Sequence, residues 1–138
     1  MQTIREVMTK DPIVLPPDVS VAEAARRMRD ADIGCVLVRD NDRLSGILTD
    51  RDIVLRAVAE DLDLEDTKVA QLCTSELMTT KPDDSVEQVI DLMRQRAIRR
   101  VPVVENDQPV GIVSLGDLAI RRDQSSVLGQ ISSAPPRN

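Results

Sequence analysis

The residues of this chain that could do chemistry are a hydroxyl and a carboxylate, placed three positions apart and present twice. The phrase GILTDRD carries Thr49 and Asp52, and the phrase GIVSLGD carries Ser114 and Asp117. In both phrases a strand-like apolar run led by glycine ends at the hydroxyl, and a helix is expected to begin there. The first amides of a helix lack backbone partners and carry the positive end of its dipole, so this position suits a phosphate.

The same spacing also has a purely structural explanation. Thr-x-x-Asp and Ser-x-x-Asp are helix-capping patterns, and a cap would explain each motif taken singly. Two features favour a binding role. The glycine-led context repeats in both phrases, and ordinary capping boxes already occur elsewhere, at Ser20 with Glu23 and at Ser85 with Gln88.

The two phrases belong to an internal duplication. A shift of 65 positions aligns residues 4–58 with residues 69–123 without a gap. Identical pairs run through the alignment, among them Pro17/Pro82, Asp18/Asp83, Ser20/Ser85, Met28/Met93, Val36/Val101, Asn41/Asn106, Gly46/Gly111 and Asp52/Asp117. A repeat of this length indicates one supersecondary unit used twice.

Each copy predicts the same order of elements. An extended stretch ending in proline leads to a capped helix with apolar residues at helical spacing, then to a buried strand, CVLV or VPVV. A turn-rich segment follows, then a strand ending in the glycine-led phrase, and a last helix. We expect an α/β fold of two tandem β-α-β-β-α repeats. The boundaries predicted are 1–62 for the first repeat with its lead-in, 63–123 for the second with its lead-in, and 124–138 for a flexible tail.

Composition disfavours several classes of protein. The net charge of −6 argues against bulk electrostatic binding to nucleic acid or to an anionic membrane. The absence of Phe, Tyr and Trp removes the rings on which single-stranded bases stack. There is no apolar run long enough to span a membrane and no signal peptide, so we expect a cytoplasmic protein.

Catalysis and metal binding are also disfavoured. The chain has no histidine, GxSxG, Walker lysine or HExxH, so we expect no enzyme and no metal site. The acidic stretch at residues 60–66 is interpreted as a solvated linker, with a carboxylate-only metal site as the alternative. Cys35 and Cys73 have no metal-like spacing; they are interpreted as buried thiols, with redox pairing as the alternative.

The order of these motifs resembles that of a CBS-domain pair, or Bateman module. The stretches that carry the resemblance are VMTKDPIVLPPDVSVAEAARRM, GILTDRD, MTTKPDDSVEQVIDLM, IRRVPVV and GIVSLGD, which span roughly residues 4–123. The resemblance implies CBS repeats packed as one pseudo-twofold module. No catalytic domain is attached, so we expect a stand-alone member. Such pairs bind adenosine-containing ligands between their repeats and often form homodimers.

The resemblance also implies roles for single residues. The hydroxyl of each motif would donate to a phosphate and the aspartate would accept from both ribose hydroxyls, while the first strand and the helix–strand corner come from the other repeat. Site A would then combine Thr49, Asp52, Met78, Thr79, Arg99, Arg100, Val101 and Pro102. Site B would combine Ile13, Val14, Gly34, Cys35, Val36, Leu37, Ser114 and Asp117.

The two corners make the sites unequal. In this family an arginine before a hydrophobic-Pro pair commonly reaches the ligand phosphates, and Arg100 stands there; its counterpart is the uncharged Cys35, and Leu37 replaces Pro102. A guanidinium matches a phosphate with paired donors, so site A is expected to take a nucleotide. Site B is expected to take something less charged, or nothing. The alternative for Arg99 and Arg100 is a solvated helix end.

The function expected from these observations is a non-enzymatic sensor. It would bind an adenosine-containing ligand, such as AMP, ADP, ATP or S-adenosylmethionine, without requiring a cofactor. Binding would change the geometry of a homodimer and so its fit to a separate protein target, which the sequence does not name. The alternative is a ligand-independent protein-interaction module with vestigial clefts.

Overall fold

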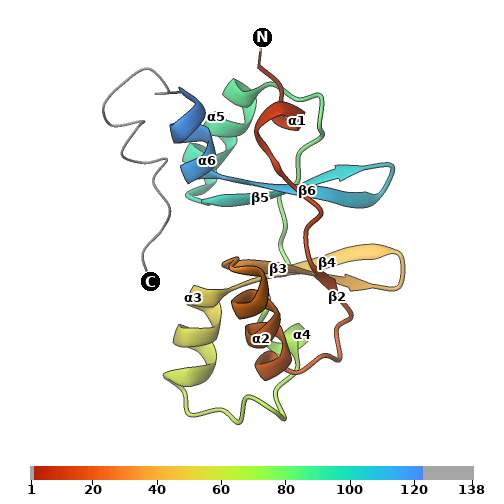
Figure 1. The fold of residues 1–138 in the computed structure, drawn as a ribbon, viewed down its shortest axis with the longest axis vertical. Helices are drawn as coiled ribbons and strands as arrows, with labels where there is room; N and C mark the ends of the chain where they lie inside the picture. Colours follow the sequence, from red (N-terminus) through yellow and green to blue (C-terminus); the bar gives the residue numbers. More distant parts are fainter. Residues whose placement is uncertain (1, 123–138) are drawn as a thin grey trace. The chain divides into compact units, whose positions relative to one another are not determined.

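A computed structural model describes residues 2–122, and these residues form two compact units (Figure 1). The first-repeat unit comprises Pro12–Leu77 together with Asn106–Gln108. The second-repeat unit comprises the residues up to Asp11, Met78–Glu105 and the residues from Pro109. Each unit has one three-stranded sheet with helices against it, so the predicted α/β fold of two repeats is confirmed. The tail predicted at 124–138 lies outside the described residues.

The first-repeat unit follows the predicted element order. Its elements are β2 (Val14–Leu15), α2 (Val21–Ala31), β3 (Cys35–Asp40), β4 (Arg43–Thr49), α3 (Asp50–Ile53), a π-helical turn η1 (Val54–Val58) and α4 (Val69–Leu72). The sheet has the order β2-β3-β4; β2 is parallel to β3, and β3 is antiparallel to β4.

The second-repeat unit has the same core of elements. They are α1 (Ile4–Val7), β1 (Thr9–Lys10), α5 (Val86–Arg96), β5 (Arg100–Glu105), β6 (Gln108–Ser114) and α6 (Leu115–Arg122). The sheet order is β1-β6-β5. The extended stretch predicted before α5 contributes only a parallel bridge between Thr80 and Val103, whereas its counterpart in the first repeat forms the strand β2.

The long helix of each repeat begins at a predicted cap. The backbone amide of Gln88 donates to Ser85 Oγ (3.1 Å), and Gln88 Oε1 accepts from the Ser85 amide (3.0 Å), which completes a capping box. At Ser20 only half of the box forms. Ser20 Oγ accepts from the Glu23 amide (3.0 Å), but the Glu23 carboxylate pairs with the guanidinium of Arg26 (3.2 Å) instead.

Each unit has its own aliphatic core. The core of the first-repeat unit includes Leu15, Val21, Ala24, Met28, Val36, Val38, Leu48, Ile53, Ala57, Val69 and Leu72. The core of the second-repeat unit includes Ile4, Val7, Val86, Val89, Ile90, Met93, Val101, Val103, Val113 and Leu118. The methionines of the two long helices are therefore core residues, as their helical spacing predicts. Across residues 2–122, no helix combines the length and apolar character needed to cross a membrane.

The leading segments of the two repeats are exchanged between the units. Helix α1 opens the first repeat in the chain but packs in the second-repeat unit, where the amide of Ile4 donates to the Asp84 carbonyl (2.9 Å). Helix α4 opens the second repeat but packs in the first-repeat unit, where the amide of Val69 donates to the Val19 carbonyl (2.8 Å). The two hydrogen bonds are equivalent under the 65-residue shift. The boundaries 1–62 and 63–123 therefore describe units of sequence, and the compact units cross them.

This exchange explains the glycine that leads each repeated phrase. A Cβ atom on Gly46 would lie 2.5 Å from Cys73 Sγ, and one on Gly111 would lie 2.7 Å from Met8 Sδ and 2.8 Å from the Thr9 carbonyl oxygen. Met8 and Cys73 are equivalent residues of the two leading segments. Neither glycine has a positive φ, so close approach of a second backbone, and not a special turn, requires it.

Candidate functional site

The first hydroxyl–aspartate pair lies where β4 ends and α3 begins. Thr49 is the N-cap residue: its Oγ1 accepts a hydrogen bond from the amide of Asp52 (3.1 Å), and Asp52 Oδ2 accepts from the amide of Thr49 (2.9 Å). The capping explanation is thus observed in the structure. It fixes both side chains at the start of the helix, which is the position where helix amides are unpaired.

The cap leaves part of each side chain for another use. Thr49 acts only as an acceptor in the cap, so its hydroxyl hydrogen remains available to donate. Asp52 uses Oδ2 for the cap, and its other oxygen, Oδ1, lies 3.8 Å from Nε of Arg56. The Asp52 side chain as a whole is 17% exposed, so it is held in place without being fully buried. Capping and ligand binding are therefore compatible at this pair.

Arg56 is a residue that the sequence analysis missed. Its Nε faces Asp52 Oδ1, and its Nη1 donates to the carbonyl oxygen of Leu72 (2.9 Å), the last residue of α4. The guanidinium thus connects the carboxylate of Asp52 to the exchanged leading helix. The signal that could have identified it is its position four residues after Asp52, matched by Arg121 four residues after Asp117.

Cys73 follows Leu72, and the charges of Asp52 and Arg56 both affect the pKa of its thiol. The thiol is half-buried and unpaired with the other cysteine. Burial raises the pKa of the Cys73 thiol, the negative charge of Asp52 raises it further, and the positive charge of Arg56 lowers it. Since a cysteine reacts as its thiolate, the thiol can report on the pairing of the two charges.

Neutralising each charge should therefore change Cys73 reactivity in opposite directions. In a Cys35→Ala background, Asp52→Asn lowers the thiol pKa and is expected to speed reaction with a disulfide reagent at neutral pH. Arg56→Gln raises the thiol pKa and is expected to slow it, because the thiolate fraction outweighs the partly compensating change in nucleophilicity. The measurement is the pseudo-first-order rate with Ellman's reagent as a function of pH.

The matched control is Arg51→Gln, which removes a charge from an exposed position of the same helix. It should leave the rate unchanged. If Asp52→Asn and Arg56→Gln both accelerated the reaction, local loosening would be the cause, and the opposite effects of the two charges on the thiol would be refuted.

The second pair repeats part of this geometry in the second-repeat unit. Ser114 ends β6, and its Oγ accepts from the amide of Asp117 in α6 (3.0 Å). Both side chains are half-buried. The amide of Leu115 donates to the carbonyl of Arg99 (2.8 Å), and the equivalent bond in the first repeat joins the amide of Asp50 to Gly34 (2.9 Å).

Each unit brings a hydroxyl–aspartate pair together with the corner of its own repeat. In the first-repeat unit Cys35 lies opposite Thr49 in the β3–β4 register and is buried, and Val14 of the first strand lies opposite Leu37. The amide of Leu37 also donates to the carbonyl of Ile13 (2.9 Å). The first-repeat unit therefore holds the pair predicted for site A and the strand and corner predicted for site B.

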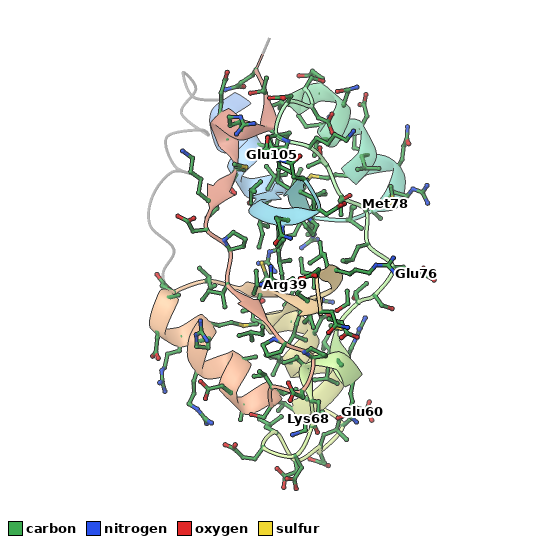
Figure 2. The ribbon with its side chains drawn as sticks, turned by 90° about the vertical axis from the view of Figure 1, so that its right-hand side faces the viewer. Arg39, Glu60, Lys68, Glu76, Met78 and Glu105 are labelled. Atoms are coloured by element: carbon green, nitrogen blue, oxygen red, sulfur yellow. The ribbon has the colours of Figure 1, made fainter. Side chains whose placement is uncertain are left out.

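The second-repeat unit holds the complementary set. Arg100 is the first residue of β5. The carbonyl of Pro102 in the same strand accepts a hydrogen bond from the amide of Thr80 (3.0 Å). Thr80 directly follows Met78 and Thr79 in the chain, and Met78 is labelled in Figure 2. Because sites A and B each draw on both units, the assembly of their residues stays a prediction.

Across residues 2–122 no group of three or more His, Cys, Asp or Glu side chains is placed to hold a metal ion, and the chain has no histidine.

Comparison with known proteins gives the family. The model of the CBS domain matches residues 4–59 and again residues 69–122. The CBS domain-containing protein YhcV of Bacillus subtilis is 36% identical over 129 residues, which cover 94% of this chain and 91% of that protein.

Solved structures agree with the sequence matches. The structure of Hypoxic Response Protein I with two coordinated zinc ions is 32% identical, with a TM-score of 0.74 over 88% of this chain and 99% of that one. The CBS domain pair of protein MJ0100, in complex with 5′-methylthioadenosine and S-adenosyl-L-methionine, is 26% identical, with a TM-score of 0.81 over 91% of this chain and 99% of that one. Two matches to one domain model, in register with the internal duplication, show that this chain belongs to the CBS-domain family as a pair of CBS repeats.

Proposed function

We propose that this protein is a non-enzymatic regulatory module that binds an adenosine-containing ligand through Thr49 and Asp52. The proposal is carried by the capping hydrogen bonds between Thr49 and Asp52. The cap holds both side chains at the start of a helix and leaves the Thr49 hydroxyl hydrogen and Asp52 Oδ1 uncommitted to it. A fixed carboxylate oxygen suits the two hydroxyls of a ribose, and a hydroxyl beside helix amides suits a phosphate.

The proposed class of ligand follows from the hydrogen-bond donors and contacts that the site A residues would supply. Arg100 would supply a guanidinium for phosphates, with Arg99, Met78, Thr79 and Pro102 as further contacts of site A. The chain has no aromatic ring, so an adenine would lie among aliphatic side chains. AMP, ADP, ATP and S-adenosylmethionine all fit this description, and the complex of the MJ0100 pair with two adenosine derivatives supports the class. In site B the residue equivalent to Arg100 is the buried Cys35, which has no charge, and we propose that site B binds the ligand more weakly or not at all.

Isothermal titration calorimetry with these four compounds tests the proposal. We expect saturable heat from at least one of them. A second function, that of a ligand-independent interaction module, is favoured by one observation: the capping hydrogen bonds account for Thr49 and Asp52 without a ligand. Flat titrations with all four compounds, from protein shown to be folded, would favour that function.

We propose further that the module acts as a homodimer on a separate protein target. Three large aliphatic side chains of the π-helical turn η1 are exposed to solvent: Val54 is 54% exposed, Leu55 48% and Val58 52%. Burying apolar area of this kind against a second copy is favourable, and a ligand that prefers one dimer geometry would shift its population.

Charging this face is expected to give a monomer. The double substitution Val54→Glu with Val58→Glu places two carboxylates on each copy and removes the apolar contact, so sedimentation velocity should show the mass of one chain where the wild type shows two. Glu60→Gln, which changes a charge just beyond the same turn, is the control and should leave the mass unchanged. A monomeric wild type, or an unchanged mass in the double variant, would contradict the proposed interface.

A further inference from the structure

The duplication places an arginine in one leading segment and an alanine at the equivalent position of the other. Arg5 of α1 and Ala70 of α4 are equivalent residues of the exchanged leading segments. Their backbones are held alike: the amide of Arg5 donates to the Pro82 carbonyl (2.9 Å), and the amide of Ala70 donates to the equivalent carbonyl of Pro17 (3.3 Å). The two copies therefore differ in the side chain and not in the position of the segment.

In the second-repeat unit the Arg5 guanidinium pairs with the carboxylates of Glu105 and Asp83. Its Nη2 lies 2.8 Å from Glu105 Oε2 and 3.6 Å from Asp83 Oδ1, so two carboxylates bind one cation. The amide of Arg5 is bonded to the carbonyl of Pro82. Pro82 is buried, and Glu105, labelled in Figure 2, is half-buried.

In the first-repeat unit both equivalent positions also have carboxylates, but Ala70 stands where the second-repeat unit has Arg5. Asp18 and Asp40 stand at the positions of Asp83 and Glu105, and within the described part of the chain neither has an ion pair within 4.0 Å. A groove of about 410 Å³ is lined by the end of β2 through Pro17 and by the end of β3 from Arg39 to Asn41, so Asp40 lines it and Asp18 follows its last residue on the β2 side. Pro17 is only half-buried and Asp40 is exposed, in contrast with their counterparts.

Arg39 lines the same groove without filling it. Its Nη1 donates to Oε1 of Gln108 in the same unit (2.8 Å), and its counterpart in the second repeat is the uncharged Val104. Arg39 therefore weakens the attraction of the groove for a cation but makes no ion pair with Asp18 or Asp40.

We propose that this groove binds the guanidinium group of an arginine presented by a partner protein. The second-repeat unit shows which group the equivalent positions hold: an arginine whose guanidinium pairs with two carboxylates. A planar guanidinium is suited to this arrangement because it can donate to two carboxylates at once. The net charge of −6 favours the approach of such a basic partner. This binding is independent of the adenosine ligand.

NMR titration of the full ¹⁵N-labelled chain tests the inference, with the blocked tripeptide Gly-Arg-Gly as probe. We expect saturable shifts of the Leu15, Asp40 and Asn41 amides, and none with the neutral citrulline analogue. Ala70→Arg supplies the guanidinium within the chain and should abolish the shifts; the position is exposed, so the variant should fold.

Three further variants fix the sign of the charge that the groove prefers. Asp40→Asn should weaken binding about threefold and Arg39→Gln should tighten it about threefold, since exposed ion pairs contribute little each. Arg5→Ala should open the equivalent groove and add shifts at Glu105. Absence of saturable shifts, equal binding of the citrulline peptide, insensitivity to Ala70→Arg, or loss of binding in Arg39→Gln would each overturn the proposal, the last by indicating an anion site.

Discussion

The Asp52→Ala variant should bind the adenosine ligand about a hundredfold more weakly than the wild type. The substitution removes the carboxylate that we propose as the acceptor of both ribose hydroxyls, and a hydrogen bond to a charged group contributes about 1.5 kcal/mol or more. Two such bonds amount to about 3 kcal/mol, and each 1.4 kcal/mol corresponds to about tenfold in the dissociation constant. Calorimetry with the tightest-binding adenine compound measures the change.

Two controls separate the loss of ligand contacts from the loss of the helix cap. Asp117→Ala changes the equivalent residue of the second repeat and should retain most of the binding. Asp52→Asn keeps an oxygen that can accept from the amide of Thr49, so its fold should be intact while the affinity falls. Unchanged affinity in a folded Asp52→Ala protein would show that the pair is a helix cap and nothing more.

The largest effect on stability is expected from Gly111→Ala. The added Cβ would lie 2.8 Å from the carbonyl oxygen of Thr9, a backbone atom of β1, and 2.7 Å from Met8 Sδ. The methionine can rotate away, but the carbonyl can move only with its strand, which pairs with β6 through Lys10 and Gly111. Overpacking of this kind costs about 3 kcal/mol, a large part of the stability of a domain.

Urea denaturation of three alanine variants checks this reasoning. Gly46→Ala should cost less than Gly111→Ala, because its shortest contact is with the side-chain sulfur of Cys73 and its nearest backbone atom is 3.2 Å away. Gly116→Ala should stabilise by up to about 1 kcal/mol, because its Cβ meets only Ser114 Oγ at 3.8 Å and alanine favours the helix α6. If Gly116→Ala lowered the free energy of unfolding more than Gly111→Ala did, the packing explanation would be refuted.

Much of the fold could be predicted because its signals are local. The helix after Ser85 has a capping box and apolar residues at helical spacing, and the strands at Val36 and Val101 are continuous apolar runs rich in valine. The exchange of α1 and α4 could not be predicted in the same way. It depends on backbone hydrogen bonds, such as that from Ile4 to Asp84, which have no side-chain signature.

The candidate site was predictable only in part. Thr49 and Asp52 were identified by spacing, and the structure shows them forming a cap. Arg56 was missed because a surface arginine on a helix has no distinctive pattern, and its role depends on Leu72, which comes from a distant segment. The glycine context that favoured ligand binding has a packing cause at Gly46. The binding proposal therefore depends on Asp52 Oδ1, the oxygen that the cap does not use.

The exchanged leading segments have a consequence for how such a chain could arise. A single ancestral repeat of this kind would have had no core partner for its own leading helix, and two identical copies would have satisfied each other by swapping those helices. Gene duplication and fusion would then have joined a domain-swapped dimer into one polypeptide. For the same reason, cutting the chain between the repeats would leave each fragment without the helix that covers its core, and only the two fragments together would restore both.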